Sequence, residues 1–237
     1  MARPMFMVLG LVTATMTALP ACDDFAPPVE LTAPVVVGVV AEPPVVAPGA
    51  RTRLTPLIAT PDGPVSGPAS AISATWTLTE TLPGVAPFGE LIPNADGSAF
   101  YQAPMTLPTL PPNALPLDSV QLDVVLDGRK TSVLKAVLVA SLPTANPEIA
   151  SLTADGIAVA DTLELAVGTP AELSVSTAPA ATDRARYAWY TSVGTIEQYQ
   201  SSPCTLVAES PGSGWLYVVV RDGQLGVTWR AVPLVVR

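Results

Sequence analysis

The chain is 237 residues long and carries 20 acidic against 11 basic residues, for a formal net charge of −9, with no histidine. This balance excludes a nucleic-acid-binding surface, which needs clusters of Lys and Arg to contact phosphates, and disfavours docking on anionic lipid headgroups. The missing histidine excludes Ser-His-Asp and Cys-His catalytic arrangements and most catalytic zinc sites, so we predict a non-enzymatic protein without cofactor, metal or catalytic residue.

The first 21 residues have the three-part layout of a secretory signal peptide. Arg3 provides the positive start, residues 5–19 form an apolar stretch, and the small Ala21 precedes the expected cut. A membrane-spanning helix would need about 20 predominantly apolar residues. The stretch here is shorter and stops at Pro20, so we predict that residues 1–21 are a cleaved signal peptide.

Residues 19–22 are Leu-Pro-Ala-Cys, with Leu three positions and Ala one position before Cys22. This tetrapeptide resembles the lipobox of bacterial lipoprotein precursors. The resemblance implies that the Cys22 thiol receives a diacylglyceryl group, that the signal peptide is cut before it, and that the new amino terminus is commonly acylated. Each buried CH₂ contributes about 0.8 kcal/mol, so two or more acyl chains give stable anchoring, which labelling with palmitate would report.

The lipid predicts an exported protein held on a bacterial membrane, at its periplasmic or cell-surface face, with that membrane as a partner. Asp23 resembles the inner-membrane retention signal of enteric bacteria. Other lineages use other rules, so the choice between inner and outer membrane stays open. Residues 22–34 are rich in Pro and Ala, and we predict that they form a short tether between the lipid and the folded part.

Strand-like runs separated by Pro- and Gly-containing segments begin at residue 35. Val120, Leu122 and Val124 alternate with Gln121 and Asp123, and this period of two indicates a strand with one buried face. The strands expected in the first half are residues 35–40, 51–59, 72–79, 98–102, 120–126 and 131–140. Together they predict a first β-sandwich over residues 35–142.

The second half repeats this plan, and we predict a second sandwich over residues 147–237. Each half has a tryptophan in the middle of a strand, Trp76 or Trp189, and each ends with two strands joined by Asp-Gly, at residues 127–128 and 222–223. Asp-Gly between alternating runs is a strong hairpin signal because the turn favours positive φ. The strands expected here are residues 148–153, 163–167, 171–177, 184–191, 195–199, 205–208, 215–221 and 227–236.

Both halves resemble the bacterial immunoglobulin-like domains of secreted and surface proteins. Residues 89–104, which run from Gly-Glu-Leu-Ile to Tyr-Gln-Ala-Pro, and residues 189–194 and 214–223, with the Trp strand and the closing hairpin, are similar to motifs of that family. Neither half has the paired core cysteines of antibody domains, and Leu216 stands where many relatives have Tyr. The resemblance implies an all-β fold of two tandem immunoglobulin-like β-sandwiches after a cleaved signal peptide.

The candidate ligand-binding residues are aromatic, because aromatic side chains on a sheet can stack on sugar rings or form hot spots for a protein partner. Aromatic residues are concentrated in the second half of the chain. Trp189 is expected in the core, as the Trp of the corresponding immunoglobulin strand is. The side chains that remain as a possible binding patch are Tyr190, Trp215, Tyr217 and Trp229.

The direction of Trp215 and Tyr217 depends on register, because a shift of one residue turns every side chain of a strand to the other face. Aligning the two Asp-Gly turns places both rings inward, which is the interpretation that we favour. Taking the run Leu216, Val218 and Val220 as the core row places them outward. They would then form a binding patch with Tyr190 or Trp229.

The remaining reactive side chains have structural interpretations. Cys204 lies in a strand-like segment without positive charge nearby, so we expect a buried, inert thiol. Asp155, Asp161 and Glu164 lie in turn-rich sequence, where acidic residues commonly serve turn formation rather than catalysis.

Taken together, these features predict a lipid-anchored, non-enzymatic envelope protein with an interaction or structural display role. Its partner would be an envelope protein or a polysaccharide. The alternative function is a carbohydrate-binding module that uses the aromatic residues of the second domain, and an enzyme is the third hypothesis. The sequence leaves the oligomeric state open.

Overall fold

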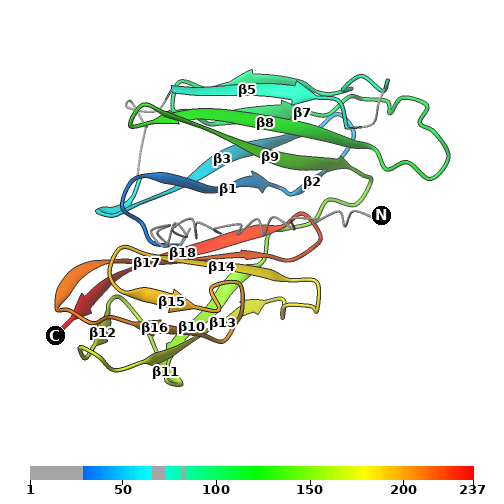
Figure 1. Ribbon diagram of the computed structural model, residues 1–237. Helices are drawn as coiled ribbons and strands as arrows, with labels where there is room; N and C mark the ends of the chain where they lie inside the picture. Colours follow the sequence, from blue (N-terminus) through cyan, green and yellow to red (C-terminus); the bar gives the residue numbers. More distant parts are fainter. Residues whose placement is uncertain (1–28, 66–72, 82–83) are drawn as a thin grey trace, which may run out of the picture.

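A computed structural model describes residues 29–65, 73–81 and 84–237 of the chain (Figure 1). The signal peptide expected at residues 1–21 and the lipid site expected at Cys22 lie outside the described residues. The described part of the chain forms eighteen strands and no helix. Consequently, these residues include no helix with the length and hydrophobicity needed to cross a membrane.

The first sandwich consists of two sheets. One sheet contains, in order, β1 (Val35–Glu42), β3 (Arg51–Thr60), β7 (Ala99–Gln102) and β6 (Glu90–Pro93), and β4 (Gly63–Pro64) pairs with β3. The other sheet contains, in order, β2 (Val45–Val46), β9 (Arg129–Val139), β8 (Leu117–Leu126) and β5 (Ser73–Thr79). The pairing of β2 with β9 is parallel, and the other pairings are antiparallel.

The second sandwich has the same plan. One sheet contains, in order, β11 (Ile157–Ala158), β10 (Glu148–Ala154), β13 (Ala171–Ala178), β16 (Cys204–Val207) and β15 (Thr195–Glu197). The other sheet contains, in order, β12 (Leu163–Leu165), β18 (Val227–Val236), β17 (Gly212–Arg221) and β14 (Arg186–Thr191). Here too a short early strand, β12, joins the last strand in parallel. The repeated order is that of immunoglobulin-like domains, and the predicted all-β fold of two tandem sandwiches is confirmed.

Each sandwich has its own apolar core, and a tryptophan lies in each. Trp189 is fully buried, as the sequence predicts, and its Nε1 donates to the backbone oxygen of Ser201 at 2.8 Å. Trp76 makes the equivalent bond to the oxygen of Gly97 at 3.0 Å. Each indole therefore buries its ring while its one polar group keeps a partner.

The two Asp-Gly sequences form different connections. Asp127 and Gly128 have the expected positive φ values, 47° and 76°, and join β8 to β9 as a two-residue turn. The second hairpin, of β17 with β18, is also present, but its connection is the five-residue loop 222–226. The Asp222 carboxylate closes this loop by accepting from the N–H of Gly226 at 2.9 Å. The predicted hairpin is therefore confirmed, and its loop lies between the strands expected at residues 215–221 and 227–236.

The two sandwiches stack face to face, so that four sheets lie in layers (Figure 1). The outer face of the sheet with β1 and β3 lies against the outer face of the sheet with β14, β17 and β18. The contact is an apolar cluster, which we call the interdomain cluster, formed by Leu31, Val37, Leu57, Ala59, Tyr217, Val219 and Val227. Because its members come from both sandwiches, the two domains share one continuous buried interface.

Residues 29–31 belong to this folded body, although the sequence predicts a tether as far as residue 34. Val29 and Leu31 are buried. The N–H of Leu31 donates to the oxygen of Thr191 at 2.7 Å, and the N–H of Thr191 donates to the oxygen of Val29 at 3.0 Å. The segment thus runs along β14, an edge strand of its sheet. Burial of two apolar side chains favours this position over a solvated tether.

Candidate functional site

The four aromatic candidates lie together, but between the domains. Tyr217 is fully buried, and Tyr190, Trp215 and Trp229 are partly buried against the interdomain cluster. The rings of Tyr217 and Trp229 stack with centroids 6.1 Å apart and planes 14° apart, and the Trp215 ring lies 6.4 Å from that of Tyr217. Three aromatic rings in a row therefore fill part of the contact between the sandwiches.

Tyr217 also joins the two domains by hydrogen bonds. Its hydroxyl donates to the carbonyl oxygen of Thr60 at 2.7 Å and accepts from the N–H of Thr60 at 3.3 Å. Burial raises the pKa of Tyr217 to about 12, so the hydroxyl keeps its proton at neutral pH. A Cβ atom at Gly63 would lie 3.0 Å from the Trp215 ring, so a glycine at this position lets the indole approach the backbone closely.

The pairing of β17 with β14 and β18 defines which face each of its side chains occupies. Leu216, Val218 and Val220 lie in the core of the second sandwich, whereas Trp215 and Tyr217 point out of it, toward the first sandwich. The favoured inward orientation is therefore wrong. The physical reason is the five-residue loop 222–226. In the first hairpin the last inward side chain of the strand is one residue before the Asp-Gly pair, whereas in this longer hairpin it is two residues before the pair.

The outward orientation does not create an aromatic platform in solvent, because the first sandwich covers it. A carbohydrate-binding function of this patch would need the domains to separate. A signal for this burial is present in the sequence: residues 215–220 of β17 are all apolar. A continuous apolar run is typical of a strand that is buried on both faces.

Polar contacts across the interface come from residues that belong to no sequence motif. Arg221 Nη2 donates to the oxygen of Val37 at 2.8 Å. Asn146 Nδ2 donates to the oxygen of Ala41 at 2.7 Å, while its Oδ1 accepts from the N–H of Val227 at 2.9 Å. The connection between the sandwiches is therefore bonded to both of them through the Asn146 amide, which limits how the domains can move.

A second buried polar group lies within the first sandwich. The Asp118 carboxylate accepts from the Tyr101 hydroxyl and the Gly89 N–H, both at 2.8 Å, and from the Phe88 N–H at 3.3 Å. Burial, reinforced by this carboxylate, raises the pKa of Tyr101 far above its ordinary range. A Cβ atom at Gly89 would overlap the Tyr101 ring. The carboxylate is occupied by these donors, and it fixes the segment before β6.

The other reactive candidates have structural surroundings. Cys204 is buried, as predicted, and burial raises the pKa of its thiol to about 12, which disfavours the reactive thiolate. Asp155 Oδ1 accepts from the N–H of Glu172 at 2.8 Å, and Glu164 lies 3.3 Å from Arg237 in an exposed ion pair. In the ranges that the structure describes, no three or more His, Cys, Asp or Glu side chains are grouped to hold a metal ion.

Comparison with known proteins gives matches to solved structures alone. No protein-family model matches the chain, and no curated protein is significantly similar to it. The N-terminal Ig1-2 module of the Drosophila receptor protein tyrosine phosphatase DLAR is 12% identical over 86% of this chain and 99% of that chain, with a TM-score of 0.30. The fibronectin(III)-like modules of Clostridium thermocellum CbhA are 15% identical over 86% of this chain and 94% of that chain, with a TM-score of 0.29.

A third similar structure is the D00-D0 domain of intimin, 12% identical over 85% of this chain and 98% of that chain, with a TM-score of 0.30. Superpositions of this quality carry no argument about function. The fold assignment is therefore based on the strand order and the two cores of this chain itself.

Proposed function

We propose that this chain is a lipid-anchored, non-enzymatic protein of a bacterial envelope, whose two sandwiches act as one rigid module that binds an envelope protein. The observation that supports this proposal is the face-to-face stack, because the interdomain cluster makes a single body out of two domains. An immunoglobulin-like fold hosts many functions. The partner of the anchored body is therefore determined by the surface that this body would present.

The chain that leads from the lipid at Cys22 would reach the folded part at one end of the stack. Cys22 precedes Val29 by seven residues, a separation that an extended chain spans with at most about 25 Å. Residues 30–35 line a surface pocket together with Leu126, Asp127 and Arg129. The end of the first sandwich that carries the turn between β8 and β9 would therefore face the membrane.

The opposite end carries a long uncharged loop. β8 spans ten residues, so its start at Leu117 lies about 30 Å from the turn that follows its end. The preceding residues, 103–116, include five prolines and no charged side chain. Met105 and Leu115 in this loop are 82% and 65% exposed. Large apolar side chains exposed on the end that points away from the membrane are the kind of surface that a protein partner covers.

A photo-crosslinking residue at position 105 tests this surface in the anchored protein. We expect it to yield a discrete adduct with an envelope protein, because the loop would be in contact with the partner. The matched control is Ile157, which is 74% exposed on β11 at the opposite corner of the stack (Figure 1). Adducts of the same kind from both positions, or none from position 105, would contradict the proposal.

The lipid anchor is tested separately. Cys22→Ala is expected to abolish labelling with palmitate and to release the protein from the membrane fraction, because the thiol that carries the lipid is gone. Fractionation and metabolic labelling of the two proteins measure this. Wild-type protein without label, together with a variant that stays on the membrane, would refute the anchor.

A further inference from the structure

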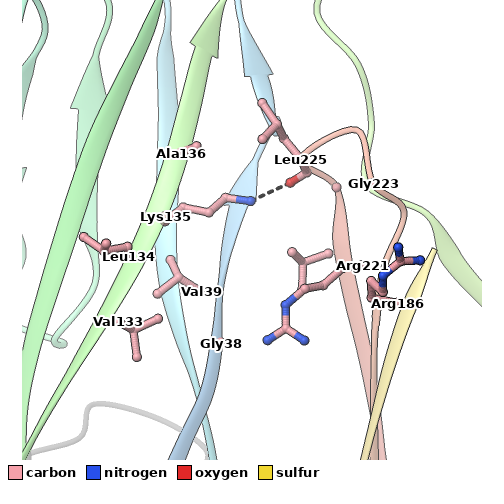
Figure 2. Close-up of a pocket in the computed structure, with 12 residues that line it drawn as sticks. Gly38, Val39, Val133, Leu134, Lys135, Ala136, Arg186, Arg221, Gly223 and Leu225 are labelled. Carbon is pink, nitrogen blue, oxygen red and sulfur yellow. Dashed lines mark hydrogen bonds between the residues drawn. The ribbon is translucent and has the colours of Figure 1, made fainter. Parts of the chain in front are cut away.

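A pocket of about 340 Å³, open to solvent on one side, lies between the two sandwiches beside the interdomain cluster (Figure 2). Its walls come from β1 and β9 of the first sandwich and from β14, β17, β18 and the loop 222–226 of the second. The apolar side chains of the lining are Val39, Val133, Leu134, Ala136, Leu225 and Val227. This volume lies at the lower end of the roughly 300–1,000 Å³ that small-molecule sites occupy.

Three basic residues and no acidic residue line this pocket. Lys135 donates to the carbonyl oxygen of Leu225, and Arg221 donates to that of Val37. Figure 2 shows these two side chains entering the space between the sandwiches from opposite sides, with Arg186 beyond Arg221 as seen from Lys135. The three ion pairs found among the described residues include none of these cations.

Lys135 occupies a position of β9 at which the alternation of the strand predicts a buried apolar residue. It belongs to the inward row of β9 with Val133 and Val137 and is only 7% exposed. Burial lowers the pKa of Lys135 to about 8, Asp222 raises it, and Arg221 lowers it further. Asp222 Oδ1 accepts from two N–H groups of its own loop, and the ion pairs found among the described residues include none between Asp222 and Lys135. A buried ammonium near a guanidinium, with Asp222 acting only from outside ion-pair distance and no carboxylate in the lining, is unfavourable unless a further anion compensates the charge.

We infer that this pocket binds a small organic anion, with a carboxylate or phosphate group between Lys135 and Arg221 and an apolar body against Val39 and Leu225. Ammonium and guanidinium groups have three and five N–H donors, so the carbonyl bonds that they now make leave further donors for an anion. The planar guanidinium matches the two oxygens of such a group, and the ammonium adds a point charge.

Both sandwiches supply walls of the site, so an anion in the pocket would stabilise the closed stack, as any ligand of the folded form does. This inference does not depend on the lipid anchor or on the loop at residues 103–116. The two proposals can therefore fail independently of each other.

Binding is tested with three probes that share one ring: benzoate, phenyl phosphate and the uncharged benzamide. They are titrated at constant ionic strength into the full chain in detergent, and the melting temperature and the amide resonances of Leu225 and Gly226 are followed. We expect saturable shifts with at least one of the two anions and at least tenfold weaker binding of benzamide, because charge-assisted hydrogen bonds are lost. The two anions distinguish a carboxylate ligand from a phosphate ligand.

The variants Lys135→Met and Arg221→Gln should each weaken anion binding roughly tenfold, since each removes a charged donor. Lys130→Met is the matched control, because Lys130 lies exposed on the same strand and pairs with Asp123 at 2.9 Å, outside the pocket. Binding should also weaken as the pH rises above about 8, where the Lys135 ammonium, faced by Arg221 and Asp222, loses its proton.

Three results would each overturn the inference. One is the absence of saturable binding by both anions, another is equal binding of benzamide and benzoate, and the third is unchanged affinity in Lys135→Met. Because methionine keeps the length and apolar character of the lysine stem, Lys135→Met remains informative even if Arg221→Gln does not fold.

Discussion

Tyr217→Ala is expected to lower the free energy of unfolding by about 3–5 kcal/mol, the range observed when large buried aromatic side chains are truncated. The ring is fully buried and stacked on Trp229, so its removal leaves a cavity between the sandwiches. The carbonyl oxygen of Thr60 also loses the hydroxyl as a hydrogen-bond donor, and the N–H of Thr60 loses it as an acceptor. The shared contact predicts one unfolding transition for the wild-type stack, and its loss in Tyr217→Ala should divide that transition into two. Urea denaturation and calorimetry measure both effects.

Tyr217→Phe is the matched control for this experiment. It keeps the ring in the aromatic row and removes only the hydroxyl, so we expect a loss of about 1–2 kcal/mol and a transition that stays single. Two results would show that the ring does not hold the sandwiches together. One is a loss of unfolding free energy in Tyr217→Ala below about 1–2 kcal/mol, and the other is a single transition close to that of the wild type.

Asp118→Ala is expected to destabilise the first sandwich by about 3–5 kcal/mol, because two partly buried N–H groups and one buried phenol lose their acceptor at once. The donors are Phe88, Gly89 and Tyr101. The damage should be local, so amide exchange is expected to accelerate in the segment before β6 and in β7, with the second sandwich unchanged. Hydrogen exchange read by mass spectrometry, with urea denaturation, checks both statements.

Asp123→Ala serves as the comparison on the same strand. Asp123 bonds to Ser132 and pairs with Lys130 at the surface, and exposed ion pairs contribute about 0–1 kcal/mol. We therefore expect a much smaller change than for Asp118→Ala. Equal losses of unfolding free energy in the two variants would show that the buried carboxylate stabilises the fold no more than the exposed one.

Most strands of this protein can be predicted from period-two alternation. The inward row Val120, Leu122, Val124 of β8 is buried as expected, and so is Trp189. These predictions succeed because alternation reports directly which side chains leave water when a sheet packs. The pairs Asp127-Gly128 and Asp222-Gly223 predict two hairpins, and both exist.

The candidate site was harder to predict, because it depends on contacts between distant parts of the chain. Whether Trp215 and Tyr217 face inward follows from the length of the loop 222–226, which the Asp-Gly signal alone does not reveal. The burial of residues 29–31 against Thr191 has no local pattern at all. Two signals were present in the sequence: the unbroken apolar run of residues 215–220, and Lys135 within an apolar inward row.

The central claim is that the two sandwiches form one face-to-face body. Small-angle X-ray scattering of the chain from residue 23 onward tests it most directly. A single compact body of this length should have a radius of gyration of about 17 Å. Two sandwiches arranged end to end, with centres roughly 35 Å apart, would give about 22 Å. The stacked arrangement predicts the smaller value, and a radius near the larger one would contradict it.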